Sequence, residues 1–285
     1  MEKSVVSSSP WYMDWQNREH ASAFDVRHAL TDWQLLKIYE SFSDVQLLRE
    51  RTTADSEKTL LEVGCATGDF HRYLKLRLPR LRYRGADISQ AAIARAQEKY
   101  PGASFHLIQP GTSLAQLLPA LGLNEKPEIV YSKDVVHHQV RPFEFVFDLL
   151  GAASETVIFR TRTRDVGPTL ADPNLSCQYH YQGWMPYIVI NLEELLNHIH
   201  REAPQAEVLV YRNHRVLGGR ENRFLPKECY LPETGTAETT IAVFLKTDHA
   251  GRVRVEDRKD MNPAYPFSYR LKNVAYRTVH RLIGR

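Results

Sequence analysis

Short apolar runs alternate with amphipathic helical stretches from Ser56 to Asp248, and this alternation constrains the fold more than any other feature of the chain. Apolar runs rich in branched residues, separated by helical stretches, are typical of a parallel sheet that helices cover on both faces. No clear helix separates the last two runs, so we expect these two to pair in the antiparallel sense. The predicted strands are 58–63, 82–87, 103–109, 127–133, 155–161, 206–212 and 239–247.

The fold class is therefore α/β: a Rossmann-like, doubly wound sheet of seven strands, mostly parallel with one reversed strand, and helices on both faces. Three regions are expected: a helical N-terminal flank or lid at 1–55, the main domain at 56–248 with an irregular acceptor loop at 164–190, and a basic C-terminal tail at 249–285. The acceptor loop is longer than the roughly 15 residues of a plain connection, which favours a role at a binding site.

Composition excludes several classes of protein. No apolar stretch approaches the roughly 18 residues of a membrane span, and the first residues lack the apolar run of a secretory signal, so we expect a cytoplasmic protein. The three cysteines are far apart and odd in number, which predicts neither a disulfide framework nor a metal site. Five basic residues follow Asp260 and exceed the formal net charge of +3, so the remainder carries no positive excess for nucleic acid.

The segment LLEVGCATGDF, residues 60–70, follows the first strand with a G-x-x-x-G turn. The first strand-to-helix turn of such a sheet is the usual place of ligand contact, and glycines there let backbone approach the ligand. The nearest alternative is the dinucleotide motif G-x-G-x-x-G, but Ala66 stands where its middle glycine would fall. Asp87 ends the second strand about 20 residues further on, where a carboxylate accepts ribose hydroxyls. A ribosyl ligand without a strong phosphate cradle is indicated.

S-adenosylmethionine fits that description, since it carries a ribose and an amino-acid moiety but no phosphate. The segments LLEVGCATGDF, YRGADISQAAIARAQEKYP and EIVYSKDVVHHQV resemble motifs of the class I S-adenosylmethionine-dependent methyltransferases, of the small-molecule and methyltransferase-domain group. The resemblance covers residues 58–160, about a third of the chain, and implies a seven-stranded sheet with a reversed last strand.

The resemblance also implies which residues hold the cofactor. Glu62, Gly64 and Gly68, with Cys65 of the same turn, would line the methionine end, while Asp87 and Ile88 would meet the ribose and adenine. One departure concerns the residue after the third strand, where many members carry an acid that meets the adenine amine. Gln109 stands near this position, and its amide oxygen can accept the same hydrogen bond.

Methyl transfer from a sulfonium requires orientation and, for a hydroxyl acceptor, a base. His137 and His138 follow the fourth strand, and a histidine with a near-neutral pKa suits proton removal. The alternative is a structural role without catalysis, in which one imidazole packs against the following helix while the other is solvated.

Acceptor-binding candidates come from the fifth strand and the acceptor loop. Arg162 and Arg164 share one face of the strand, where they form either an anion clamp or a solvated extension with surface ion pairs. Tyr179 and Trp184 in the loop either stack on a sugar or planar acceptor or serve as packing residues.

The residues predict O-methylation of a small molecule or glycan. Methylation of nucleic-acid bases is disfavoured, because the fourth strand ends in SKDV rather than in the Asn/Asp-Pro-Pro-Tyr/Phe motif that holds a flipped base. The alternative is a catalytically inactive protein that keeps the fold for binding or regulation. Residues 267–285 form a basic amphipathic helix that either docks on protein or lies peripherally on an anionic membrane, at its inner surface.

Overall fold

The computed structural model describes residues 30–109, 111–180, 183–219 and 222–258 of the chain. The helices in these ranges are α3 (Asp32–Tyr39), α4 (Ser43–Arg51), α5 (Asp69–Arg77), α6 (Gln90–Lys99), α7 (Leu114–Leu117), α8 (Pro142–Ala152) and α9 (Leu192–Glu202). The strands are β1 (Thr59–Val63), β2 (Arg82–Asp87), β3 (Ser104–Leu107), β4 (Ile129–Lys133), β5 (Thr156–Arg164), β6 (Cys177–His180), β7 (Gly183–Pro186), β8 (Ile190–Asn191), β9 (Glu207–His214), β10 (Arg223–Phe224), β11 (Ala237–Phe244) and β12 (Val253–Asp257). Short 3₁₀ turns span Val136–His138, Lys227–Tyr230 and Pro232–Thr234.

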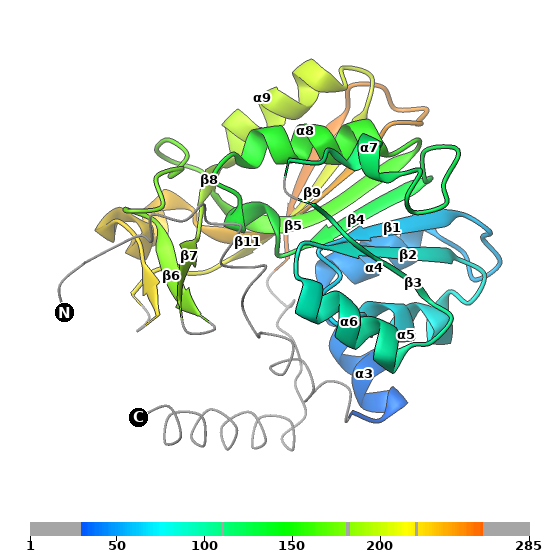
Figure 1. The fold of residues 1–285 in the computed structure, drawn as a ribbon. Helices are drawn as coiled ribbons and strands as arrows, with labels where there is room; N and C mark the ends of the chain where they lie inside the picture. Colours follow the sequence, from blue (N-terminus) through cyan, green and yellow to red (C-terminus); the bar gives the residue numbers. More distant parts are fainter. Residues whose placement is uncertain (1–29, 110, 181–182, 220–221, 259–285) are drawn as a thin grey trace, which may run out of the picture.

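The main sheet has the strand order β12-β9-β11-β5-β4-β1-β2-β3 (Figure 1). Neighbours among β1 to β5 are parallel, whereas β11 runs antiparallel to both β5 and β9. The seven predicted strands are β1 to β5, β9 and β11, and the predicted antiparallel pairing of the last two is confirmed. Two further strands were not predicted: β12 pairs in parallel with β9, and the short β8 pairs in parallel with β5.

Helices cover both faces of this sheet, as predicted (Figure 1). Alternate residues of a strand point to opposite faces, so Leu60 packs in the cluster with α3 to α6 while Leu61 packs with α7 to α9. The same alternation puts Glu62 on the face of α3 to α6.

The described part of the N-terminal flank packs on the main domain. Thr31 caps α3, with its side chain accepting a hydrogen bond from the backbone of Gln34 in a capping box. The ring of Tyr39 at the end of α3 stacks on Tyr73 of α5 with ring centroids 5.1 Å apart. α4 then lies against β5 and β11. Stacking on α5 and contact with the sheet make these two helices part of the core layer on that face.

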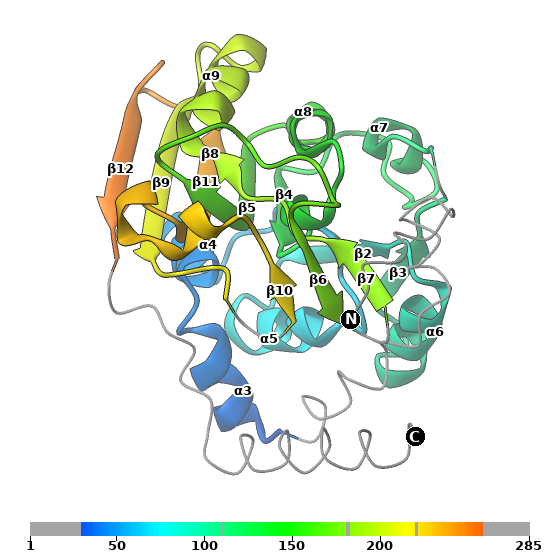
Figure 2. The same cartoon turned by 90° about the vertical axis from the view of Figure 1, so that its left-hand side faces the viewer.

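The acceptor loop is more regular than the sequence predicts. β6 and β7 form an antiparallel hairpin within it, and β10 adds a third strand to this small sheet. Ile188, just after the hairpin, donates its backbone N–H to the carbonyl of His137 at 2.7 Å. Figures 1 and 2 show the small sheet beyond the end of the main sheet at which β5 finishes.

The basic tail falls mostly outside the described residues. β12, which falls in the predicted tail, is instead the edge strand of the main sheet, beside β9. The amphipathic segment 267–285 lies outside the described residues, so its docking or membrane contact stays a prediction. Among the described residues, no helix has the length and apolar character needed to cross a membrane.

Candidate cofactor and acceptor site

The glycine turn follows β1 as predicted. Gly64 and Gly68 have φ values of 85° and 78°, in the left-handed region that glycine adopts without strain. A Cβ at Gly64 would lie 2.2 Å from Cγ2 of Val135, and one at Gly68 would lie 2.5 Å from the ring of Phe105. The glycines therefore let the turn pack tightly on protein on both sides, which fixes where its backbone faces a ligand.

Asp87 at the end of β2 is tied to this turn. Its Oδ2 accepts a hydrogen bond from the backbone N–H of Ala66 at 2.8 Å, and its Oδ1 accepts one from that of Ser89 at 2.9 Å. Both carboxylate oxygens of Asp87 thus accept hydrogen bonds from backbone N–H groups on either side of the proposed ribose position. The carboxylate thus shapes the glycine turn and stands beside it, which the sequence spacing alone does not indicate.

Glu62 lies two residues before Gly64 and is buried. The hydroxyl of Tyr83 donates a hydrogen bond to its Oε2 at 2.5 Å. Burial raises the pKa of the Glu62 carboxyl to about 8, against the lowering effects of the Tyr83 hydrogen bond and of Lys133. At neutral pH this group is mostly a neutral acid until a positive charge comes close.

The other three predicted cofactor residues differ in exposure. The side chain of Cys65 is buried in the core, so the turn offers its backbone there. Ile88 follows Asp87 and is half-buried, and Gln109 lies exposed just past β3. Ile108 donates its backbone N–H to the carbonyl of Asp87 at 2.8 Å, which keeps the segment carrying Gln109 beside the end of β2.

His137 and His138 lie in the 3₁₀ turn after β4, and both are buried, with ring centroids 4.1 Å apart. Nδ1 of His138 is 2.7 Å from the carbonyl oxygen of Pro186. Burial, together with the charges of His138 and Arg162, holds the pKa of His137 well below its usual value, so this imidazole is neutral. Nδ1 of His137 is buried without a hydrogen-bond partner in the described part of the chain.

The arginines of β5 are buried in ion pairs rather than solvated. Arg160 donates two hydrogen bonds to Asp134, at 2.9 and 2.5 Å, and Arg162 donates one to the same carboxylate at 3.1 Å. Arg162 also donates to the hydroxyl of Tyr187 at 3.0 Å and lies 3.6 Å from Glu238. The alternative of a solvated strand extension is therefore wrong, because these guanidinium groups lie beneath the acceptor loop and α4.

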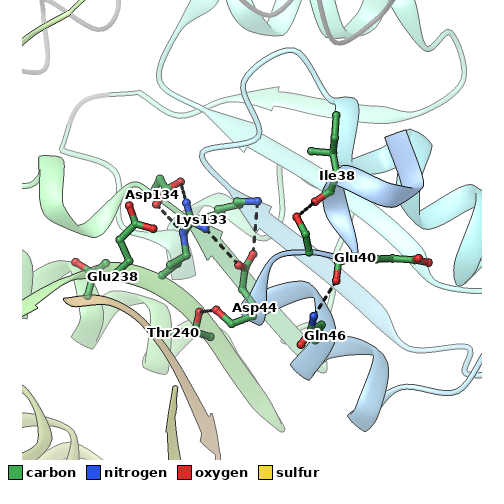
Figure 3. A network of polar contacts seen from close by, with 12 residues as sticks. Ile38, Glu40, Asp44, Gln46, Lys133, Asp134, Glu238 and Thr240 are labelled. Atoms are coloured by element: carbon green, nitrogen blue, oxygen red, sulfur yellow. Dashed lines mark hydrogen bonds and ion pairs between the residues drawn. The ribbon is translucent and has the colours of Figure 1, made fainter. Parts of the chain in front are cut away.

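This ion-pair network continues to the N-terminal flank (Figure 3). Asp44 of α4 is fully buried, accepts a hydrogen bond from the hydroxyl of Tyr131, and lies 3.9 Å from Nζ of Lys133. The Lys133 ammonium stands 3.0 Å from the ring centroid of Phe42. The flank therefore contributes a charge and an aromatic ring at the end of β4, beside the strand that carries Glu62.

Arg164 is placed differently from Arg160 and Arg162. Its Nε donates a short hydrogen bond to the carbonyl of Val166, at 2.5 Å, and its Nη1 lies 4.0 Å from Glu228. Nη1 is buried without a hydrogen-bond partner among the described residues. Of the two arginines that the sequence assigns to an anion clamp, Arg164 therefore has fewer hydrogen bonds to acidic side chains than Arg162.

Tyr179 and Trp184 face each other across the β6–β7 hairpin, with ring centroids 5.4 Å apart. Phe224 of β10 adds a third ring, 5.0 Å from that of Trp184. Tyr179 is 45% exposed and Phe224 44% exposed, so this trio is not buried as an ordinary core cluster. We call Tyr179, Trp184 and Phe224 the aromatic trio.

β1 to β5 and β9 run in one direction and β11, between β5 and β9, runs in the opposite one, which is the arrangement that the resemblance to class I methyltransferases implies. An acidic residue lies near the end of both β1 and β2, as expected. Residues 61–153 match the model of a family described as a methyltransferase domain, which is about a third of the chain. The predicted S-adenosylmethionine-dependent methyltransferase, and S-adenosylmethionine as its cofactor, are thereby confirmed. None of the curated proteins matches the chain significantly.

Solved structures with a similar arrangement include the plantazolicin methyltransferase BpumL, at 15% identity and a TM-score of 0.49, covering 82% of this chain and 93% of that one. The magnesium protoporphyrin IX methyltransferase ChlM from Synechocystis PCC 6803 aligns at 12% identity and a TM-score of 0.48, over 84% and 99%. An O-methyltransferase from a trans-AT PKS multienzyme of Brevibacillus brevis aligns at 10% identity and a TM-score of 0.48, over 84% and 80%. At such low identities no acceptor is carried over to this chain.

Several residues of the site escaped the sequence prediction. Every second residue of a strand points to the same face, so Tyr83 lies on the same face of β2 as Asp87. Tyr83 could therefore have been predicted from its spacing to Asp87. Asp44 and Phe224 carry no such signal, since their neighbours in space are far away in sequence. In the described ranges, no group of three or more histidine, cysteine or acidic side chains is arranged to hold a metal ion.

Proposed function

We propose that this protein transfers the methyl group of S-adenosylmethionine to a hydroxyl oxygen of a small molecule or glycan. The observation that carries the proposal is the pair of buried imidazoles of His137 and His138 just after β4, the strand beside β1, where Nδ1 of His137 has no hydrogen-bond partner among the described residues. A hydroxyl acceptor needs a base, and a neutral imidazole can accept its proton. The transferred carbon comes from the cofactor, whose sulfonium leaves as a neutral thioether.

The cofactor residues fit S-adenosylmethionine by their chemistry. Glu62 offers an oxygen to an ammonium group, and Asp87 offers acceptor positions to ribose hydroxyls. Gln109, exposed beside the end of β2, is proposed to meet the adenine amine. No phosphate-binding arrangement is needed for this ligand, which agrees with the G-x-x-x-G turn.

The aromatic trio is the proposed platform for the acceptor. Its rings come from three strands of one small sheet, and two of them are nearly half exposed. Exposed aromatic rings held at fixed positions favour stacking on a sugar or planar ring. Tyr187 directly follows β7, and its ring lies 5.2 Å from that of His137, so the hairpin that carries the trio is joined through the chain to a residue beside the proposed base.

The anion clamp is proposed for Arg164 rather than equally for both arginines. An anion at Arg162 would compete with Asp134 and Glu238 for one guanidinium, whereas Arg164 keeps a buried Nη1 without a hydrogen bond to any described residue. We propose that Arg162 acts by holding Tyr187, through the hydrogen bond to its hydroxyl. A carboxylate or phosphate on the acceptor would then meet Arg164.

Trp184→Ala is expected to raise the apparent KM of the acceptor about tenfold, because stacking on a central ring of the trio is lost. The affinity for S-adenosylmethionine should not change, since Trp184 lies on the small sheet and not at the glycine turn. Steady-state kinetics and calorimetry measure the two quantities. The matched control is Phe147→Ala, which removes an exposed ring from α8. Equal acceptor KM values for the two variants would contradict the platform.

An acceptor screen tests the proposed function itself. The protein is incubated with S-adenosylmethionine carrying a labelled methyl group and with panels of phenols, hydroxyl-bearing heterocycles, glycans and phosphorylated small molecules. Label on a hydroxyl oxygen, lost in His137→Ala, is the expected result. Label on nitrogen would overturn the O-methylation. Cofactor binding without transfer to any panel member would favour the alternative, a binding or regulatory protein that has lost chemistry.

A further inference from the structure

The carboxyl group of Glu62 is held at one oxygen only. Oε2 accepts the hydrogen bond from Tyr83 at 2.5 Å, while no described residue forms a hydrogen bond with Oε1. The residue sits at the end of β1, directly before the glycine turn. Oε1 is therefore the oxygen left for a ligand, and it carries the proton of a neutral Glu62 as long as Tyr83 remains the donor to Oε2.

Tyr83 is itself fixed on three sides. Its ring stacks on that of His71 with centroids 5.1 Å apart, and the ring of Phe105 meets it edge-on at 5.7 Å. A Cβ on Gly85 would lie 2.6 Å from the Tyr83 hydroxyl oxygen, so glycine at this position makes room for that hydroxyl. The hydrogen-bond donor to Glu62 therefore has little freedom to move.

Charged and titratable groups face Glu62 from every element around it. Tyr83 and Asp87 come from β2, Lys133 from β4, Asp69 from α5, and Cys65 from the glycine turn. Burial raises the Glu62 pKa to about 8; Tyr83 and Lys133 lower it, and the two aspartates raise it. A ligand ammonium would add a positive charge at short range and favour the ionised carboxylate.

We propose that Tyr83 is a positioning residue that aims Oε1 of Glu62 at the ammonium group of the cofactor, and that Glu62 releases its proton to solvent when the cofactor binds. The O–H bond on Oε1 breaks, its electron pair stays on the carboxylate, and the proton passes to buffer. The ammonium then donates a hydrogen bond to Oε1. This inference rests on the proposed cofactor site at the glycine turn. It adds that cofactor binding there is coupled to the release of one proton.

Calorimetric titration with S-adenosylhomocysteine in buffers of different ionisation enthalpy counts the released protons. With a free-protein pKa of about 8, the full-length protein should release about 0.9 proton at pH 7, and its affinity should rise about ninefold from pH 6 to pH 7 and about fivefold from pH 7 to pH 8. The ligand's own amine loses its proton near pH 8, so the acid side of the profile is the informative one. Binding without proton release at pH 7 would overturn the inference and leave the cofactor site intact. No binding would overturn the proposed function instead.

Three variants separate positioning from mere packing. Glu62→Gln should bind S-adenosylhomocysteine without releasing a proton, and its affinity should no longer fall as the pH is lowered below 8. Tyr83→Phe should shift the acid side of the pH profile to higher pH, because the hydrogen bond that lowers the Glu62 pKa is gone. The control is Tyr100→Phe, which removes a hydroxyl bonded to another carboxylate, Asp69, at 2.9 Å and should leave the profile unchanged. A Tyr83→Phe profile identical to that of Tyr100→Phe would overturn the role of Tyr83.

Discussion

Asp134→Asn is expected to lower the free energy of unfolding by about 2 kcal/mol, because two buried guanidinium groups lose their nearest carboxylate, which is itself one-third exposed (33%). Asp134 serves both Arg160 and Arg162. Burial alone would raise the pKa of its carboxyl, but the two guanidinium groups outweigh burial and hold that pKa well below the usual value. Asparagine keeps the shape and tolerates the left-handed φ of 60°, so the variant tests charge rather than backbone strain.

Denaturant unfolding near neutral pH measures this effect. The matched control is Asp32→Asn. Asp32 also pairs with an arginine, Arg72, at 2.6 Å, but the side chain of Asp32 is 58% exposed. An exposed pair contributes about 1 kcal/mol or less. The depressed pKa of Asp134 means that its contribution is present at neutral pH and is lost only as the pH falls through the folded-state pKa. Equal losses in the two variants would contradict a buried network.

Gly68→Ala is expected to weaken cofactor binding at least a hundredfold. The new Cβ would lie 2.5 Å from the ring of Phe105 and 3.3 Å from Cβ of Ala96, on a residue whose φ of 78° already disfavours any side chain. Neither neighbour can move without disturbing the core between β3 and α6. The turn must therefore shift, and its backbone would no longer face the proposed cofactor site between Glu62 and Asp87.

Gly102→Ala is the control for backbone strain. Gly102 has a φ of 88°, but a Cβ there would meet no atom within 4 Å. This variant should lose about 1 kcal/mol of stability and keep full cofactor affinity. Calorimetry of both variants with S-adenosylhomocysteine, after unfolding curves show that they fold, makes the comparison. Parental affinity in Gly68→Ala would contradict the packing account of the turn.

The sequence predicts most of the main sheet because its strands are apolar on both faces and its helices amphipathic. The run LLEV, for example, sends Leu60 and Leu61 into opposite cores. Asp87 and the glycine turn were predictable from spacing, since a strand end and a turn lie at the same edge of a parallel sheet. β12 escaped because it is short and polar, and the hairpin of β6 and β7 escaped because its turn-rich sequence reads as irregular.

The polar side of the site was predicted in part. The alternation that puts Arg162 and Arg164 on one face of β5 puts Arg160 there too, but the acidic partners of these arginines could not be named from the sequence. Glu238 comes to Arg162 through the antiparallel register of β11, and Asp44 comes to β4 through the packing of α4. Both contacts join residues far apart in the chain. Contacts between such residues leave no periodic pattern in the sequence, so they could not be predicted from it.

Calorimetric titration of the full-length protein with S-adenosylmethionine and S-adenosylhomocysteine, compared with Asp87→Ala, tests the central claim most directly. Asp87 holds the turn through the backbone N–H of Ala66 and is the residue proposed to bind the ribose. The account predicts that the parent binds both molecules and that Asp87→Ala, folded by its unfolding curve, binds them at least tenfold more weakly. A parent protein that binds neither molecule would contradict the account.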